Sequence, residues 1–245
     1  MSLQLDFPAV LERWPNFLAG AALTLELAAF ATVLGALFGT LAAVGRGSRS
    51  PLIAGACKGY VETIRNTPLL VQIFLVYFGL ASLGLKFSAF TVAVAALTIN
   101  VGAYTAEIMR AGICSVDEGQ REAATALGMS WWHMTRRVIF PQAMRVIIPP
   151  TGNEFISMLK TTSLVVAVPF TGDLYSKAEE ISAVLYRPIP LLLVASTWYL
   201  GITTILMVGQ HYLEKRFSKG ASKRASSCRL QLATQGPTGA EGEER

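Results

Sequence analysis

A polar insert separates the apolar runs of this chain, and it reads Glu118-Gly119-Gln120-Arg121-Glu122-Ala123-Ala124-Thr125-Ala126-Leu127-Gly128 before continuing to Pro141. Long hydrophobic runs lie on both sides of it. Because charged residues are costly in hydrocarbon, the insert is predicted to be a loop outside the membrane. A charged loop between membrane runs is a natural place for another protein to bind and to move the membrane part.

The composition is that of an integral membrane protein. Of the 245 residues, 52% are hydrophobic and 15% are charged, which is too apolar for an ordinary soluble domain of this length. A membrane helix needs about 20 mostly apolar residues. Five runs reach that length, at about 17–44, 53–85, 87–109, 146–170 and 188–212. We therefore expect an all-α integral membrane protein with about five transmembrane helices and the insert between helices three and four.

Basic residues gather on one side of this predicted arrangement. They follow the first run, surround the insert and follow the fifth run, whereas the opposite side holds only Arg13, Lys86, Lys177 and Arg187. Because Lys and Arg in short loops stay in the cytoplasm, the bias predicts an outside N-terminus, with the insert and the C-terminus cytoplasmic. It also accounts for the net charge of +5, so no nucleic-acid partner is implied. The first run is long and follows Asp6 and Glu12 rather than a basic stretch, so we expect it to remain as a helix and not to be a signal peptide.

Local signals within the insert predict two short helices joined at a corner. Ser115 and Glu118 fit a capping box, in which each side chain satisfies a free amide of the first turn. The alanine-rich stretch that follows is a strong helix former, and Gly128 can take the left-handed conformation that closes many helices. Ser130 can cap a second helix running to Pro141, where the missing amide forces a break or a new helix start.

Two interpretations of this helix pair are available. One is a surface pair at the membrane interface, with Trp131 and Trp132 among the lipid headgroups and Arg136 and Arg137 on phosphates. The whole pattern favours the other. The insert resembles the signature cytoplasmic loop of permease subunits in binding-protein-dependent ATP-binding-cassette importers, with Glu-Ala-Ala, three residues, Gly128, nine residues and Val138-Ile139-Phe140-Pro141. Val and Phe stand where that family has Ile and Leu, and both keep the apolar character.

The resemblance implies a role for each residue of the motif. In that family the loop fits into a cleft of a cytoplasmic ATPase subunit. Ala123 and Ala124 leave room for close helix approach, Glu122 offers a charge that fixes register, and Gly128 sets a corner that transmits a push. With Pro141, these are the predicted coupling residues. The resemblance also implies that ATP and Mg²⁺ belong to the partner ATPase, and that this chain carries no cofactor and is not itself an enzyme.

Flanking segments resemble one branch of that family, the polar amino-acid permeases. The similarity covers about residues 16–217, and its motifs lie at 65–72, 103–113, 141–150 and 152–164. It implies a translocation-pore subunit that couples ATPase motion to alternating access in a bacterial inner membrane. The implied partners are cytoplasmic ATPase subunits, an extracytoplasmic amino-acid-binding protein and a second permease subunit, the same or similar.

The sequence thus divides into three parts. Residues 1–15 are predicted to be an extracytoplasmic segment, and residues 16–217 the permease domain, with its coupling loop at about 113–142. Residues 218–245 are rich in Ser, Lys, Gly, Thr and Glu, and are predicted to be a disordered cytoplasmic tail. The cysteines at 57, 114 and 228 have no metal-ligand spacing and are expected to be free thiols.

Several ionisable residues fall within the predicted membrane runs, where they are functional candidates by default. Glu62 with Arg65, and Glu107 with Arg110, are each three apart on one helix face, so we interpret both as structural ion pairs. Gly35 and Gly39 form a GxxxG pattern that we assign to helix packing.

The fourth run is too polar for contact with lipid alone. Its polar residues are Asn153, Glu154, Ser157, Lys160, Thr161 and Ser163, our candidate substrate path. In one interpretation they join helices and a neighbour neutralises Lys160. In the other they line a water-filled path, where Lys160 or a hydroxyl meets a carboxylate and Glu154 or Asn153 meets an ammonium group.

A different class of protein stays open as the alternative. The chain has no Gly-x-x-x-x-Gly-Lys-Ser/Thr phosphate loop, so it is not the ATPase itself. An ion-driven carrier or channel without an ATPase would use Glu107, Glu154 and Lys160 as a charge relay. Against it, the sequence shows neither the inverted repeat nor the pair of broken helices that many such carriers contain.

Overall fold

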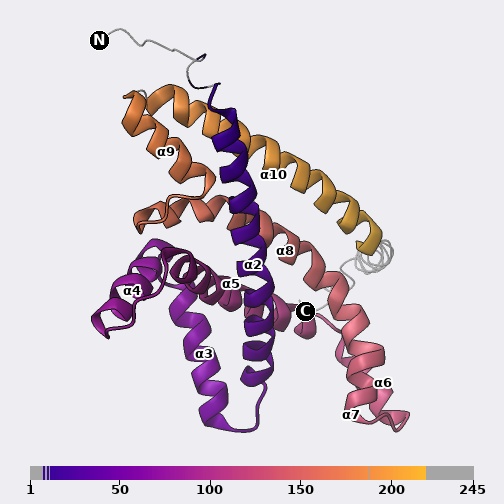
Figure 1. Cartoon of the computed structure of the whole chain (residues 1–245). Helices are drawn as coiled ribbons and strands as arrows, with labels where there is room; N and C mark the ends of the chain where they lie inside the picture. The colour runs from indigo at the N-terminus through magenta and orange to yellow at the C-terminus, as the bar shows by residue number, and fades with distance from the viewer. Residues whose placement is uncertain (1–7, 9, 11, 187, 219–245) are drawn as a thin grey trace, which may run out of the picture.

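The computed structural model describes residues 8, 10, 12–186 and 188–218, which form helices and turns without any strand (Figure 1). The elements are α2 (Trp14–Arg46), α3 (Pro51–Arg65), α4 (Leu69–Ser82), α5 (Ala89–Cys114), α6 (Glu118–Ala126), α7 (Trp131–Met134), the π-helical turn η1 (Thr135–Ile139), α8 (Phe140–Thr161), the 3₁₀ turn η2 (Thr162–Ala167), α9 (Leu174–Leu185) and α10 (Pro188–Ser218). The all-α class is confirmed. The predicted tail beyond 218 lies outside the described residues, as does most of the segment 1–15.

The centre of the molecule is the crossing of α2 over α5, visible in Figure 1. Glycines of α2 let the two backbones meet there. A Cβ at Gly39 would lie 2.5 Å from the carbonyl oxygen of Gly102, and one at Gly35 would lie 2.7 Å from the side chain of Val101. Both distances are far below a normal carbon contact, so only glycine fits. The assignment of the GxxxG pattern to helix packing is confirmed.

Apolar side chains fill the space around this crossing. The largest buried cluster joins α2, α4, α5, α8 and η2, and it contains Leu27, Ala31, Ile73, Ala93, Ala96, Leu97, Val101, Met158, Val165, Val168 and Phe170. Many large apolar side chains nevertheless remain on the outside, such as Leu41 of α2, Leu75 of α4 and Ile205 of α10. A surface of this kind is stable in lipid, which is as apolar as the side chains themselves.

The second predicted run, 53–85, is not one helix. It breaks between α3 and α4, and the two helices meet at 112°. Pro68 excludes the helical conformation from the residue before it, which ends α3 at this point. Gln72 then fixes the bend, because its amide nitrogen donates to the carbonyl oxygens of Ile64 (2.7 Å) and Thr67 (3.1 Å), while Asn100 donates to its oxygen at 3.0 Å.

The fourth run also differs from the prediction. Helix ends at Thr161, and the rest of the run is the 3₁₀ turn η2, followed by an extended segment and α9. Among the described residues, three helices (α2, α5 and α10) are long and apolar enough to span a membrane, or four if the bent pair α3–α4 is one span. The polar composition of α8 keeps it outside that set. Five spans therefore stay a prediction.

The short helix α9 closes the end of the molecule opposite the insert (Figure 1). Its start is held against α2, where the backbone amide of Leu174 donates to the hydroxyl of Thr24 at 2.9 Å. Asp173 is buried at the N-cap and accepts from the amide of Tyr175 at 3.1 Å. Cys57 and Cys114 are free thiols, and Cys228 lies outside the described residues.

Candidate functional site

The first helix of the insert, α6, begins differently from the capping box predicted at Ser115. The N-cap is Asp117, whose carboxylate accepts from the amide of Gly119 at 2.9 Å. Ser115 instead donates its hydroxyl to the carbonyl of Gly112 at the end of α5. An aspartate at this position also places a negative charge at the positive end of the helix, which stabilises the first turn. The helix predicted here is present, but the side chain that caps it is Asp117.

The predicted corner is confirmed at Gly128. Its φ is +70°, in the left-handed region, and the amide of Met129 donates to the carbonyl of Ala124 at 3.1 Å to close the turn. Ser130 then caps α7, with its hydroxyl oxygen accepting from the amide of His133. Nothing lies within 4 Å of a Cβ at Gly128. The requirement for glycine therefore comes from the backbone conformation alone and not from crowding.

The second helix of the insert continues into the membrane part without a loop. After α7 the chain passes through η1 into α8, so residues 131–161 are helical throughout. The predicted break at Pro141 is wrong, because Pro141 lies in the first turn of α8 and the preceding π-helical turn leads into it while staying helical. Both ends of η1 stay in the right-handed helical conformation. The corner is therefore joined to α8 by continuous helix.

The insert packs against the membrane part on one side only. Ala124 is buried, whereas Glu122 and Ala123 are exposed. Arg121 holds α6 to the end of α5, because its guanidinium donates to the carbonyl of Ile113 at 2.8 Å. A small cluster of Val116, Ile139, Ala143 and Ile147 fills the space beneath.

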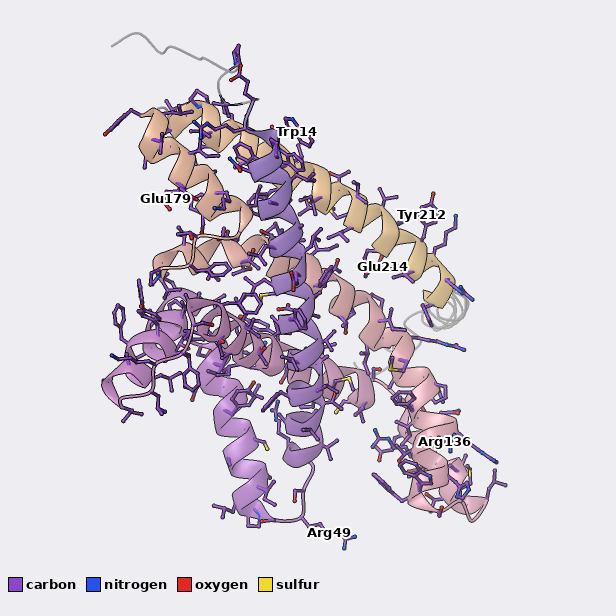
Figure 2. All side chains as sticks on the ribbon, viewed as in Figure 1. Trp14, Arg49, Arg136, Glu179, Tyr212 and Glu214 are labelled. Atoms are coloured by element: carbon purple, nitrogen blue, oxygen red, sulfur yellow. The ribbon has the colours of Figure 1, made fainter. Side chains whose placement is uncertain are left out.

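The outer side of the corner carries large apolar residues that the sequence interpretation did not assign to coupling. Leu127 is 81% exposed, Trp131 71% and Trp132 61%. Figure 2 shows the insert, marked by Arg136, at the same end of the molecule as Arg49 of the α2–α3 turn, and far from Trp14 and Glu179. An exposed apolar corner beside basic loops, rather than within a span, is a surface that suits a protein partner. The signal in the sequence is the position of these residues on either side of Gly128.

A cluster of charges joins three helices near the same end. Glu107 of α5 pairs with Arg46 of α2 at 2.8 Å, with Arg65 of α3 at 3.6 Å, and with Arg110 one turn along its own helix. The predicted Glu107–Arg110 pair is confirmed. The predicted Glu62–Arg65 pair is wrong, since Glu62 faces Lys58 at 3.7 Å instead. Arg65 turns toward the longer-range partner because the bend after it brings the end of α3 beside α5.

The polar residues of α8 fall into two groups. Asn153, Ser157 and Lys160 are exposed, and their spacing of four and three residues places them on one helix face. We call these three the polar face of α8. The described hydrogen bonds and ion pairs of residues 12–186 and 188–218 give no carboxylate partner for Lys160, so neutralisation by a neighbour within this chain is not supported.

The remaining candidates of the path are more constrained. Glu154 is half-buried beside this face. The hydroxyl of Thr161 donates to the carbonyl of Ser157 at 2.6 Å, and that of Ser163 donates to the carbonyl of Lys160 at 2.8 Å. Both hydroxyls satisfy backbone groups where α8 ends, so they shape the helix end and retain only acceptor capacity.

These features together define the class of protein. The chain matches the family described as binding-protein-dependent transport system inner membrane component over residues 35–219, and it belongs to that family. It is thus a membrane permease subunit of a transport system, as the insert predicted. Membership favours this interpretation over the ion-driven carrier, and it makes the chain a transport subunit that lacks an ATPase site of its own.

Individual relatives narrow the comparison. The chain is 48% identical to the arginine transport system permease protein ArgU of Corynebacterium glutamicum over 229 residues, covering 87% of this chain and 72% of the relative. It is 35% identical to the glutamine transport system permease protein GlnP of Escherichia coli, with 87% and 98% covered. A solved amino acid ABC transporter, crystallised with histidines, superposes with a TM-score of 0.84 at 40% identity, covering 88% of this chain and all of that one.

Proposed function

We propose that this chain is the translocation-pore subunit of an ATP-driven importer of amino acids. The substrate class is supported by relatives that are arginine, glutamine and cystine permeases and by the amino acid transporter it superposes on. The observation that carries the coupling part is the corner at Gly128, which is fixed in conformation, apolar on its outer side and continuous with α8. It is the shape expected of a segment that a moving partner grips.

In this proposal a cytoplasmic ATPase subunit binds the corner. Leu127, Trp131 and Trp132 provide the apolar contact, and the exposed Glu122 and Ala123 lie on the adjoining helix. ATP and Mg²⁺ bind to that partner and not to this chain. When ATP brings two ATPase subunits together, the Gly128 corners of the two permease subunits bound to them approach one another. The α8 helices attached to these corners then switch the path from inward-facing to outward-facing.

The substrate path runs along the polar face of α8. Asn153, Ser157 and Lys160 are uncovered within this chain, and polar groups of this kind are costly against lipid. A second permease subunit, the same or similar, would cover them and close the path. Lys160 can pair with a carboxylate, while the Asn153 amide oxygen and Glu154 can receive an ammonium group. A binding protein delivers the amino acid at the opposite end, near α9.

We further propose the orientation that the basic residues predict. Arg49 and Arg136 mark the same end of the molecule in Figure 2, whereas Trp14 and Glu179 mark the other. The first end is assigned to the cytoplasm and the second to the outside, which supports an extracytoplasmic N-terminus. The protein is then a multi-pass protein of the bacterial inner membrane.

Purification of the tagged chain from its native membrane in mild detergent tests the proposal. We expect an ATPase with a phosphate loop to co-purify and to be lost when residues 122–128 are scrambled, while the variant chain still inserts. Reconstituted complex with the binding protein should take up labelled arginine, histidine or glutamine only with ATP. A clean preparation of this chain alone, active without ATP, would establish the ion-driven carrier instead.

A further inference from the structure

A cavity of about 510 Å³ lies between the ends of α2, α3 and α5, on the same side of the molecule as the insert. It is separate from the polar face of α8 and from the corner at Gly128. Its walls come from the last turn of α2 and the turn after it, from the first two turns of α3, and from the end of α5. Its lining includes Arg46, Gly47, Ala54, Gly55, Lys58 and Arg110.

The wall of the cavity is positively charged. Arg46, Lys58 and Arg110 line it, and none of its described lining residues is an Asp or Glu. Two carboxylates pair with these cations. Glu107 is shared among Arg46, Arg65 and Arg110, and Glu62 lies 3.7 Å from Lys58. The three cations that line the cavity, together with Arg65 outside it, therefore share two carboxylates, which leaves an excess of positive charge.

The start of α3 lies directly before the lining residues Ala54 and Gly55. Ser50 at its N-cap makes no side-chain cap, and Pro51 follows it. The amides of Leu52 and Ile53 belong to the first turn, where the helix offers them no acceptor, and no partner for either is found among the described residues. Free amides and the helix dipole together make this end attractive to an anion.

Apolar side chains are exposed on the helix turns that form the cavity, and they favour a lipid as the source of the anion. Ile113 lines the cavity and is 40% exposed, while Val44, Leu52 and Ile53 are exposed on the adjoining turns of α2 and α3. Free phosphate gains nothing from exposed apolar side chains. An acidic phospholipid does, because its acyl chains cover the apolar residues while its phosphodiester reaches the cations. Basic pockets between membrane helices on the cytoplasmic side bind acidic headgroups in this manner.

We propose that this cavity binds the phosphodiester headgroup of an acidic phospholipid from the leaflet on the side of the insert. Arg46, Lys58 and Arg110 pair with the phosphate oxygens, and the small residues Gly47, Ala54 and Gly55 leave the room that the headgroup needs. The bound lipid contacts α2, α3 and α5 together, and the ion pairs of Glu107 connect the same three helices. This site depends on the chain being in a membrane and not on which substrate it carries.

Lipid titration of the purified full-length chain tests the site. Fluorescent phosphatidylglycerol is added in a neutral detergent, with phosphatidylcholine of the same chain length and glycerol phosphate as competitors. We expect saturable binding of phosphatidylglycerol at least about tenfold tighter than of phosphatidylcholine, and no effective competition by glycerol phosphate. Lys58→Gln removes one exposed charge and should weaken binding about fivefold.

A matched pair of variants separates occupancy of the cavity from general damage. Gly55 and Gly59 are exposed and a Cβ at either meets nothing within 4 Å, so a larger side chain can begin at either position of α3 without a clash. Gly55 lines the cavity and Gly59 does not. Gly55→Leu should abolish the preference for phosphatidylglycerol, and Gly59→Leu should leave it unchanged.

Three outcomes would overturn the proposal. One is equal binding of phosphatidylglycerol and phosphatidylcholine. A second is competition by glycerol phosphate as strong as that by the lipid, which makes the cavity a site for soluble anions. The third is an unchanged preference in both Gly55→Leu and Lys58→Gln. If Gly55→Leu lowers the melting temperature, its loss of binding could reflect damage to the fold. The lipid preference of Lys58→Gln then decides whether the cavity is the binding site.

Discussion

The crossing of α2 over α5 and the corner of the insert both depend on glycine, but for opposite reasons. At Gly39 the backbone is an ordinary helix and the neighbour is too close, since a Cβ would lie 2.5 Å from a carbonyl oxygen. At Gly128 the neighbourhood is empty and the backbone itself is left-handed. The first glycine serves contact within the chain. The second serves the shape of a surface that faces outward.

The two regions also differ in where their apolar residues lie. Around the crossing they are buried in the cluster that includes Leu97 and Val101. At the corner the largest ones, Trp131 and Trp132, are exposed. The crossing is therefore covered within one chain, whereas the apolar residues of the corner would be covered only by the partner that the proposed function assigns to it. Variants at the crossing should therefore change stability, and variants at the corner should change transport.

The largest effect is expected at the crossing. Gly39→Leu forces side-chain carbon onto the backbone of α5, and overpacking of this kind costs about 3 kcal/mol. We expect little folded protein in the membrane and a melting temperature too low to measure in detergent. Gly209→Leu is the control, because a Cβ at Gly209 meets nothing within 4 Å. Since Leu is the better helix former, an unstable Gly39→Leu protein beside a stable control reports the contact and not the helix propensity.

The next effect is expected at the corner, and on transport alone. Gly128→Val places a β-branched residue in the left-handed region at a cost of about 1–2 kcal/mol, enough to shift the corner toward other conformations. ATP-driven uptake should fall about tenfold while the amount of protein and its melting temperature change little. Gly128→Asn should retain most activity, because Asn enters that region readily. Equal uptake in Val and wild-type proteins would remove the corner from the mechanism.

A smaller effect on stability is expected where the crossing meets the charge cluster. Glu107→Gln leaves Arg46, Arg65 and Arg110 without a counter-charge and should cost about 1 kcal/mol, or about 3 °C in melting temperature. Glu62→Gln breaks only the exposed pair with Lys58 and should cost about 0.3 kcal/mol. The difference should shrink as salt is added. If Glu62→Gln lowered the free energy of unfolding more than Glu107→Gln does, Arg65 would pair with Glu62, as the sequence suggested.

The smallest effect is expected at the join between the two regions. Arg121→Met removes the hydrogen bond from α6 to the carbonyl of Ile113, worth about 1 kcal/mol to the position of the insert. Hydrogen exchange of residues 118–126 should become faster while the melting temperature of the whole chain stays the same. Arg136→Met, at an exposed position of η1, should change neither quantity. Slower or unchanged exchange in α6 would show that the insert is held by its apolar cluster alone.

The sequence was sufficient where structure depends on neighbours along the chain. The turn at Gly128 and the cap at Ser130 each follow from the chemistry of one or two residues. The Glu107–Arg110 pair is of the same kind, since one helical turn sets its geometry. The all-α membrane class followed from composition.

The sequence was insufficient where several candidates compete or where distant segments meet. Ser115 and Asp117 both suit a cap, and only the actual end of α5 decides between them. Arg65 has an acidic neighbour three residues earlier, but the bend at Pro68 brings Glu107 nearer. The run from 53 to 85 is apolar throughout, so hydropathy does not reveal a bend that the side chain of Gln72 fixes. Composition identified the polar residues that we propose as the substrate path, but it did not show which of them are exposed.

The continuity of helix from Trp131 to Thr161 has a mechanical meaning. Thirty-one residues at about 1.5 Å each make a rod about 46 Å long, with the corner at one end and the polar face toward the other. A rod converts a sideways displacement at one end into a tilt, so a small movement at the corner would tilt the helix as far as its first point of bending. Pro149 and Pro150 lie within it and remove two backbone hydrogen bonds. They place that point just before Asn153, so in the proposed function the polar face would turn about it.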